Sequence, residues 1–225
     1  MKKKFLVCLT MVISCLGLIF ISCGNKTGSP IKDASVETEN SENTAIDLGL
    51  PSGLKWAAGN VGAKNPWDYG LYFAWGETVG YTAEQVVTGV KKFNMKSYDA
   101  KNIKYDLTIE QDAAHSYLGG KWRMPKREEW LELIEYCTAE WTDNYNGTGV
   151  KGYLFTSQIN DSTIFFPAAG CCDGSTVSNE GEYGNYWTVS ALSPTKAKNF
   201  IFTSWNIGPL HDYRHLGFSV RGVCE

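Results

Sequence analysis

The stretch GGKWRMPKREEWLEL, residues 119–133, marks the point where one helix stops and a second begins. The Gly-Gly pair that opens it is a typical helix C-terminal stop, because glycine adopts the left-handed conformation without steric cost. The preceding segment, residues 109–118, follows Thr108, and Gln111 lies three residues after that threonine, which is the spacing of a capping box. The sequence therefore predicts a first helix over residues 109–118.

A second helix is predicted after Pro125. Apolar side chains recur there at i, i+3, i+4 and i+7, a spacing that places them on one helical face. The members of this stripe are Trp130, Leu133, Ile134 and Cys137. Glu128 and Glu129 fall in the first turn, where the positive end of the helix dipole favours acidic side chains.

Segments with a strand pattern lie on both sides of the two helices. They are rich in aromatic and β-branched residues and are separated by Gly, Asn, Asp and Ser. The candidate strands cover residues 54–61, 69–75, 152–157, 163–168, 185–190, 198–203 and 218–223. Residues 80–105 are polar and are expected to be a loop with short elements. The order of strands, two helices and strands predicts an α+β fold, and alternation around Phe200 makes its face the expected core face.

The N-terminus has the layout of a secretory signal, with three lysines before an uncharged apolar run over residues 5–21. The run ends in Phe20-Ile21-Ser22-Cys23-Gly24, which resembles the lipobox of bacterial lipoproteins. In those proteins signal peptidase II cuts before a cysteine that carries diacylglycerol. We therefore expect residues 1–22 to be a lipoprotein signal peptide and Cys23 to be lipidated. Ordinary secretion and a retained signal-anchor helix are the alternatives.

Residues 23–45 and 46–225 differ in composition. The first segment has few apolar side chains and is expected to be a flexible tether beyond the lipidated cysteine. The second is long enough for one domain with a sizeable core. Removal of the signal leaves 18 basic and 24 acidic residues, a net charge of about −6. That balance argues against nucleic acid as a partner, because nucleic-acid binding needs a basic face.

Six blocks in order across nearly all of residues 46–225 resemble the Fibrobacter succinogenes major paralogous domain, a family common in lipoproteins of Bacteroidetes. The blocks are DLGLPSGLKWAAGNVGA (47–63), YGLYFAWGET (69–78), GGKWRMPKREEWLEL (119–133), IFFPAAG (164–170), YGNYWTVS (183–190) and GFSVRGV (217–223). That family is similar to the C-type-lectin-like fold shared with formylglycine-generating enzymes. The resemblance implies two helices flanking a small, twisted, mostly antiparallel sheet with long loops. It also implies a lipid-anchored protein of the cell envelope, at the outer membrane, with the surface and periplasmic faces both open.

Four cysteines remain in the domain, at positions 137, 171, 172 and 224. In an exported chain this even count permits two disulfides, with three connectivities open. Lectin-like domains pair a cysteine of the last strand with one in the first helix, and Val223-Cys224-Glu225 resembles that ending. The first helix here carries no cysteine. The resemblance therefore leaves Cys137, at the end of the second helix, as the next candidate partner of Cys224.

Sequence patterns for catalysis and metal binding are absent or incomplete. The chain contains neither Gly-x-Ser-x-Gly nor His-Glu-x-x-His. Formylglycine-generating relatives place two cysteines shortly before a Tyr-Arg segment, and no cysteine lies near Tyr213-Arg214. The lectin calcium signature is broken because Ile207 follows Trp205-Asn206 in place of an acid, and His211 and His215 lie in an expected loop. We therefore expect no enzymatic activity, no cofactor and no metal.

All eight tryptophans fall within the domain. Exposed aromatic rings stack on sugars or anchor protein partners. The last long loop carries the binding surface in lectin-like folds, so the resemblance points to Trp205 and Tyr213 as ligand contacts. The expected function is a non-catalytic binding or adhesion module for a glycan or a protein, attached to the membrane through its lipid. An envelope enzyme with a loop-built site and a structural envelope component without a small ligand are the alternatives.

Overall fold

The computed structural model describes residues 44–100 and 102–225. The predicted signal peptide, the predicted lipidation site Cys23 and nearly all of the predicted tether lie outside these ranges. Within them, no helix has both the length and the apolar character required to cross a bilayer.

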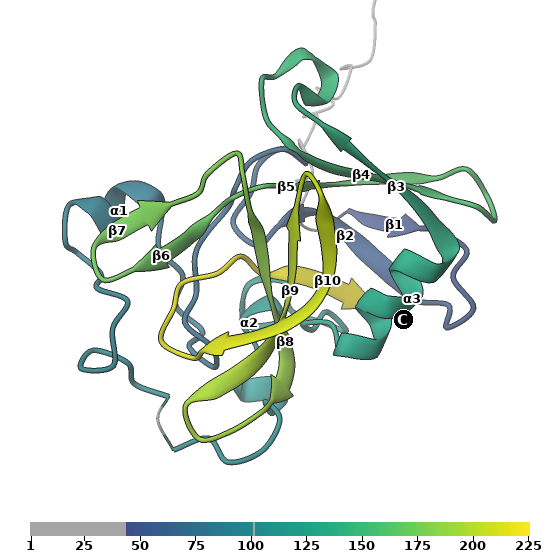
Figure 1. Cartoon of the computed structure of the whole chain (residues 1–225). Helices are drawn as coiled ribbons and strands as arrows, with labels where there is room; N and C mark the ends of the chain where they lie inside the picture. Colours follow the sequence, from purple (N-terminus) through teal and green to yellow (C-terminus); the bar gives the residue numbers. More distant parts are fainter. Residues whose placement is uncertain (1–43, 101) are drawn as a thin grey trace, which may run out of the picture. The chain divides into compact units, whose positions relative to one another are not determined.

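The described chain is a mixed α+β structure with few helices and several small antiparallel sheets (Figure 1). The helices are α1 (Ala83–Val87), α2 (Ala113–Leu118) and α3 (Arg127–Tyr136), with 3-10 turns η2 (Ile109–Gln111) and η3 (Tyr145–Gly147). The strands are β1 (Ala45–Asp47), β2 (Lys55–Asn60), β3 (Cys137–Thr142), β4 (Gly152–Ser157), β5 (Thr163–Pro167), β6 (Cys171–Asp173), β7 (Thr176–Ser178), β8 (Gly184–Ala191), β9 (Lys196–Thr203), β10 (Asn206–Tyr213) and β11 (Arg221–Cys224).

These strands form four sheets of order β1-β2-β11, β10-β9-β8, β3-β4-β5 and β6-β7. Each pairing between the named strands is antiparallel. The first sheet joins segments far apart in the chain, since Val223 of β11 lies opposite Trp56 of β2. The α+β class expected from the order of elements is therefore confirmed.

The second predicted helix is confirmed as α3. Trp130 and Leu133 of its apolar stripe are fully buried. Cys137, the last position of the predicted stripe, is also buried but has extended backbone and begins β3. The α3 helix therefore ends one residue before that cysteine.

The first predicted helix is interrupted at Asp112, whose φ of −92° and ψ of 115° are extended. Its carboxylate accepts hydrogen bonds from the N–H of His115 at 3.0 Å and the N–H of Met124 at 2.8 Å. The first bond caps α2, and the second ties that helix to the segment leading into α3. A 3-10 turn and a short α-helix thus replace the single expected helix. The expected stop is confirmed at Gly119, which has a φ of +66°.

Several predicted strands are confirmed within a few residues, namely β2, β4, β5, β8 and β9. The prediction for residues 69–75 is wrong, because that segment has isolated bridges at Tyr72 and Phe73 rather than a regular strand. The larger error concerns the region expected to be the last long loop. Its residues Asn206–Tyr213 form strand β10, which pairs with β9 along all of its length. Pro209 is compatible with this position because β10 is an edge strand.

Strands β8 and β9 separate two hydrophobic clusters. On one face, the Trp130 ring of α3 stacks on Phe200, with ring centroids 4.4 Å apart and planes inclined by 8°. On the other face, Trp187 and Ala197 belong to a second cluster that also contains Trp75. The Phe200 face is therefore confirmed as a core face, and the opposite face is buried as well.

A fully buried arginine joins two of the sheets. Arg221 of β11 donates hydrogen bonds within 3.0 Å to four acceptors, the carbonyl oxygens of Ala57, Ala58 and Phe165 and the side-chain oxygen of Asn60. Burial lowers the pKa of Arg221 to about 10. The four acceptors replace the water that the guanidinium loses on folding, and they hold β5 next to β2.

Candidate functional site

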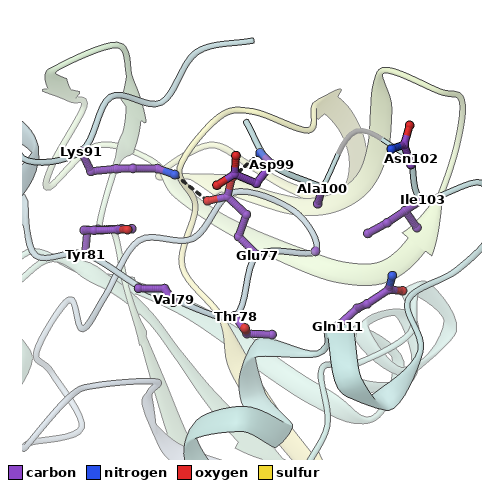
Figure 2. Close-up of a pocket in the computed structure, with 11 residues that line it drawn as sticks. Glu77, Thr78, Val79, Tyr81, Lys91, Asp99, Ala100, Asn102, Ile103 and Gln111 are labelled. Carbon is purple, nitrogen blue, oxygen red and sulfur yellow. Dashed lines mark hydrogen bonds and ion pairs between the residues drawn. The ribbon is translucent and has the colours of Figure 1, made fainter. Parts of the chain in front are cut away.

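The main hollow of the described chain has a volume of about 490 Å³. Loops following the region of Trp75 and a segment preceding η2 build it (Figure 2). It is lined by Gly76, Glu77, Thr78, Val79, Tyr81, Lys91, Asp99, Ala100, Asn102, Ile103 and Gln111. The lining mixes apolar side chains with carboxylate and amide groups, a composition suited to a ligand with both apolar faces and hydrogen-bonding edges.

An ion pair lies within this lining. Lys91 Nζ is 2.6 Å from Glu77 Oε2, and the two side chains are 10% and 9% exposed. The second oxygen of Glu77 accepts a hydrogen bond from the N–H of Asp99 at 3.0 Å. The Lys91 ammonium also lies over the Tyr81 ring, 5.2 Å from its centroid. Both oxygens of Glu77 are thus engaged by the protein, so this carboxylate positions its neighbours.

The wall of the main hollow is attached to the core at several points. The hydroxyl of Tyr98 donates to the carbonyl oxygen of Trp75 at 2.7 Å. Arg214, itself 1% exposed, donates from Nη1 to the carbonyl oxygen of Ile103 at 2.6 Å and stacks 4.2 Å from the Trp75 ring. Gly76 permits the close approach of this wall, because its φ is +81° and a Cβ there would collide with the Ile103 side chain. A wall held in this way lowers the entropy lost when a ligand binds.

Asp99, Asn102 and Gln111 add further polar groups to the lining of the main hollow. Asp99 and Asn102 are exposed and lie on the segment between Tyr98 and η2. Gln111 comes from η2, and its side-chain oxygen accepts a hydrogen bond from the N–H of Thr108 at 3.1 Å. In Figure 2, Asn102 and Gln111 lie on the side of the hollow opposite Lys91 and Tyr81. With Asp99 added to the Glu77–Lys91 pair, the main hollow carries a formal charge of −1.

Three further hollows are linked to the main one in sequence, each sharing lining residues with the one before it. The second hollow, about 460 Å³, shares Asn102 and Ile103 with the main hollow. Its remaining lining residues are Lys104, Ala191, Leu192, Ser193 and Pro194. The main and second hollows therefore meet at these two residues.

The third hollow, about 370 Å³, shares Leu192 with the second. It is lined by Arg127, Leu192, Lys198, Pro209, Leu210 and His211. The fourth, about 420 Å³, shares Pro209 and Leu210 with the third. It is lined by Tyr183, Ile201, Phe202, Thr203, Trp205, Asn206, Ile207, Gly208, Pro209 and Leu210. Each hollow therefore shares one or two lining residues with the next, and the series runs from Tyr81 in the first to Trp205 in the fourth.

The two predicted ligand contacts lie at opposite ends of β10. Trp205 precedes the strand, is 77% exposed and lines the fourth hollow. Tyr213 is the last residue of β10, and its ring lies 4.9 Å from Lys196 Nζ. The seven residue steps of β10, from Asn206 to Tyr213, span roughly 24 Å. The structure therefore does not bring the two rings together, because the loop expected to carry both is an extended strand.

The four domain cysteines are free thiols in the structure. Cys137 begins β3 and Cys224 ends β11, and their pairing stays a prediction. Burial raises the pKa of Cys137 to about 11, and it raises the pKa of Cys172 further. A raised pKa keeps a thiol protonated and poorly nucleophilic. The described thiols therefore lack the environment of an activated cysteine.

No group of three or more His, Cys, Asp or Glu side chains within the described ranges has the geometry to hold a metal ion. His211 lies on β10 rather than in a loop, and its side chain is exposed. Desolvation lowers the pKa of His215, whose Nδ1 is buried without a hydrogen-bond partner. The two histidines therefore have different environments.

Apart from His211, the residues that line the main and third hollows were not indicated by any sequence pattern. Glu77 lies inside a block that resembled the family, whereas Lys91 and Asp99 fall in the segment assigned as a polar loop. Arg127 and Lys198 belong to correctly predicted elements. No spacing rule links residues this far apart in sequence, although five lysines fall within residues 91–104.

Comparison of the chain with protein-family models, with curated proteins and with solved structures yields no significant match.

Proposed function

We propose that this chain is an envelope lipoprotein whose domain binds an extended glycan without chemically altering it. The observation that carries the proposal is the series of four hollows joined by shared lining residues. A series of adjoining sites suits a polymer better than a compact metabolite, which is usually enclosed on most sides by one pocket.

The lining favours a glycan as the polymer. Sugars present apolar C–H faces and hydroxyl edges. Val79 and Ile103 offer apolar surface, while Asp99 and Asn102 offer hydrogen-bonding groups in the same hollow. At the far end of the series, the exposed ring of Trp205 is available for stacking on a sugar. Tyr213 lines none of the four hollows, so the proposal rests on Trp205.

Binding is favoured over catalysis by the state of the reactive groups. Glu77 is engaged by Lys91 and by the N–H of Asp99, which leaves it poorly placed as a general base. Burial raises the pKa values of Cys137, Cys171, Cys172 and Cys224. An envelope enzyme remains the second class of function, and cleavage of a bound polymer, seen as new reducing ends, would replace the proposal.

The domain is proposed to have the C-type-lectin-like fold and to be displayed by lipid on Cys23. Support for the fold comes from the order of strands, helices and strands, and from the small antiparallel sheets. Support for the anchor comes from the lipobox-like residues 20–24. Labelling cells with a fatty-acid analogue tests the anchor. The wild-type chain should incorporate label and the Cys23→Ala variant should not, and an unlabelled wild-type chain would refute lipidation.

Binding is tested with the full-length chain in detergent on an array of polysaccharides. The Asn102→Trp variant places a large side chain between the main and second hollows, and it should weaken binding at least tenfold. The matched control is Val90→Trp, which adds the same ring at a 68% exposed position outside the four hollows. Equal affinities for the two variants, or no binding of the wild-type chain to any polysaccharide, would refute the proposed site.

A further inference from the structure

The third hollow has a cationic lining. Arg127, Lys198 and His211 are its three polar side chains, and Leu192, Pro209 and Leu210 complete it. Among the described residues, no carboxylate lines this hollow or the second hollow, where Lys104 supplies a further cation. This is unexpected for a chain whose formal net charge is −3.

The fold forces these basic groups together. Lys198 and His211 are directly opposite each other in the β9–β10 ladder. Directly opposed side chains have Cβ atoms about 5 Å apart, so the His211 imidazole lies beside the Lys198 ammonium. Arg127 is the first residue of α3, where the helix dipole is also positive. Backbone pairing and helix position thus bring three basic side chains to one hollow.

Two acidic side chains lie beside the third hollow, and neither makes a close ion pair with Arg127 or Lys198. Glu128 approaches Arg127 only at 4.0 Å, and its side chain is 69% exposed. Asp212 lies opposite Ala197 in the ladder, and its Oδ2 accepts a hydrogen bond from Asn199 at 3.3 Å. Its carboxylate also interacts electrostatically with His211, the preceding residue. An anionic ligand would offset the positive charge of Arg127 and Lys198 that these two acids do not fully balance.

We propose that the third hollow binds an oxyanion, a carboxylate or a sulfate, on an acidic polysaccharide. This inference rests on the proposed glycan-binding function and specifies its ligand class. Arg127 can meet either group with two parallel N–H bonds, and Lys198 adds a point charge. Leu192 and Leu210, which are 48% and 44% exposed, supply apolar surface for the attached sugar ring. The main hollow, with its charge of −1, takes a neutral part of the same chain.

Affinity of the full-length chain in detergent for charged and neutral forms of the same polymers tests this inference. One arm compares a polyuronate with its methyl ester, and a second compares a sulfated polysaccharide with its desulfated form. The wild-type chain should bind one charged form at least tenfold more tightly than its neutral form, and added salt should reduce the difference. The arm that shows the preference identifies carboxylate or sulfate as the ligand group.

The decisive variant is Arg127→Gln with Lys198→Gln. It should lose about tenfold or more in affinity for the charged polymer and keep its affinity for the neutral one. The matched control, Lys64→Gln with Lys92→Gln, removes the same charge from exposed positions outside the four hollows. Equal losses in the two double variants would overturn the inference.

Two further outcomes would also overturn it. If charged and neutral polymers bind equally, the third hollow has no role in selection, although the proposed glycan-binding function survives. If the chain binds vesicles of anionic lipid and no polysaccharide, both the inference and the proposed function are wrong, and the basic lining belongs to a lipid surface.

Discussion

Lys91 Nζ and Glu77 Oε2 lie 2.6 Å apart in the main hollow, and both side chains are at most 10% exposed. The pair links the loop after α1 to the segment after Trp75. The other oxygen of Glu77 accepts a hydrogen bond from the N–H of Asp99. The shape of the candidate site therefore depends on an interaction between two residues that sequence analysis did not select.

Lys91→Met should destabilise the fold by about 3 kcal/mol, because it leaves the Glu77 carboxylate nearly buried without its partner. The double variant Lys91→Met with Glu77→Gln should recover at least half of that loss, since glutamine is neutral and its oxygen can still accept from Asp99. Urea unfolding of the three proteins measures the difference. A single variant as stable as the wild-type chain would show that water, rather than Lys91, satisfies Glu77.

Gly184→Ala should lower the free energy of unfolding by about 1–3 kcal/mol. The added Cβ would overlap the ring of Phe202, which is fully buried in the same hydrophobic cluster as Trp130 and Phe200. Gly208→Ala is the matched control, because no atom lies within 4 Å of its added Cβ and its φ is not positive. Thermal unfolding should separate the two variants, and similar midpoints would contradict the close packing at Gly184.

Asp112→Ala should destabilise the chain by about 2–3 kcal/mol, since it removes the cap of α2 and leaves the N–H of Met124 buried without a partner. Asp112→Asn retains one acceptor oxygen and should lose about half as much. Thr82→Ala provides a comparison, because Thr82 caps the exposed helix α1 through the N–H of Gln85. Its loss should be about 1 kcal/mol or less, as measured by urea unfolding.

Buried tyrosines should make the fold sensitive to alkaline pH. Desolvation raises the pKa of Tyr72 far above its usual value of 10.0, and its hydroxyl donates to the carbonyl oxygen of Ala169 at 2.6 Å. Above pH 10 the unfolded chain releases this proton while the folded chain retains it. The folded state then binds more protons, so the free energy of unfolding falls by up to about 1.4 kcal/mol per pH unit from this group.

Tyr72→Phe should therefore cost about 1 kcal/mol near neutral pH, because the Ala169 carbonyl loses its donor, yet its stability should decline less steeply above pH 10. Tyr105→Phe, at an 82% exposed position, should leave the slope unchanged. Urea unfolding at several pH values tests both. Parallel curves for Tyr72→Phe and the wild-type chain would show that Tyr72 ionises without unfolding.

Local patterns predicted α3 and most of the longer strands because each depends on neighbouring residues. The stripe through Trp130 and Leu133 and the Gly-Gly stop are signals contained within about ten residues. Two failures came from contacts made at a distance. Asp112 interrupts the expected helix because its carboxylate is shared with Met124, and residues 206–213 are extended because they pair with β9 despite containing Pro209.

By itself, the sequence determined the α+β class, the position of α3 and the core face at Phe200, because periodicity and capping are local properties of a chain. Only the tertiary structure decided where a ligand could bind. It placed Trp205 and Tyr213 at opposite ends of β10, paired Lys91 with Glu77, and brought Arg127 next to Lys198 and His211. Such groupings arise from strand register and loop closure between distant segments, and no short-range pattern encodes them.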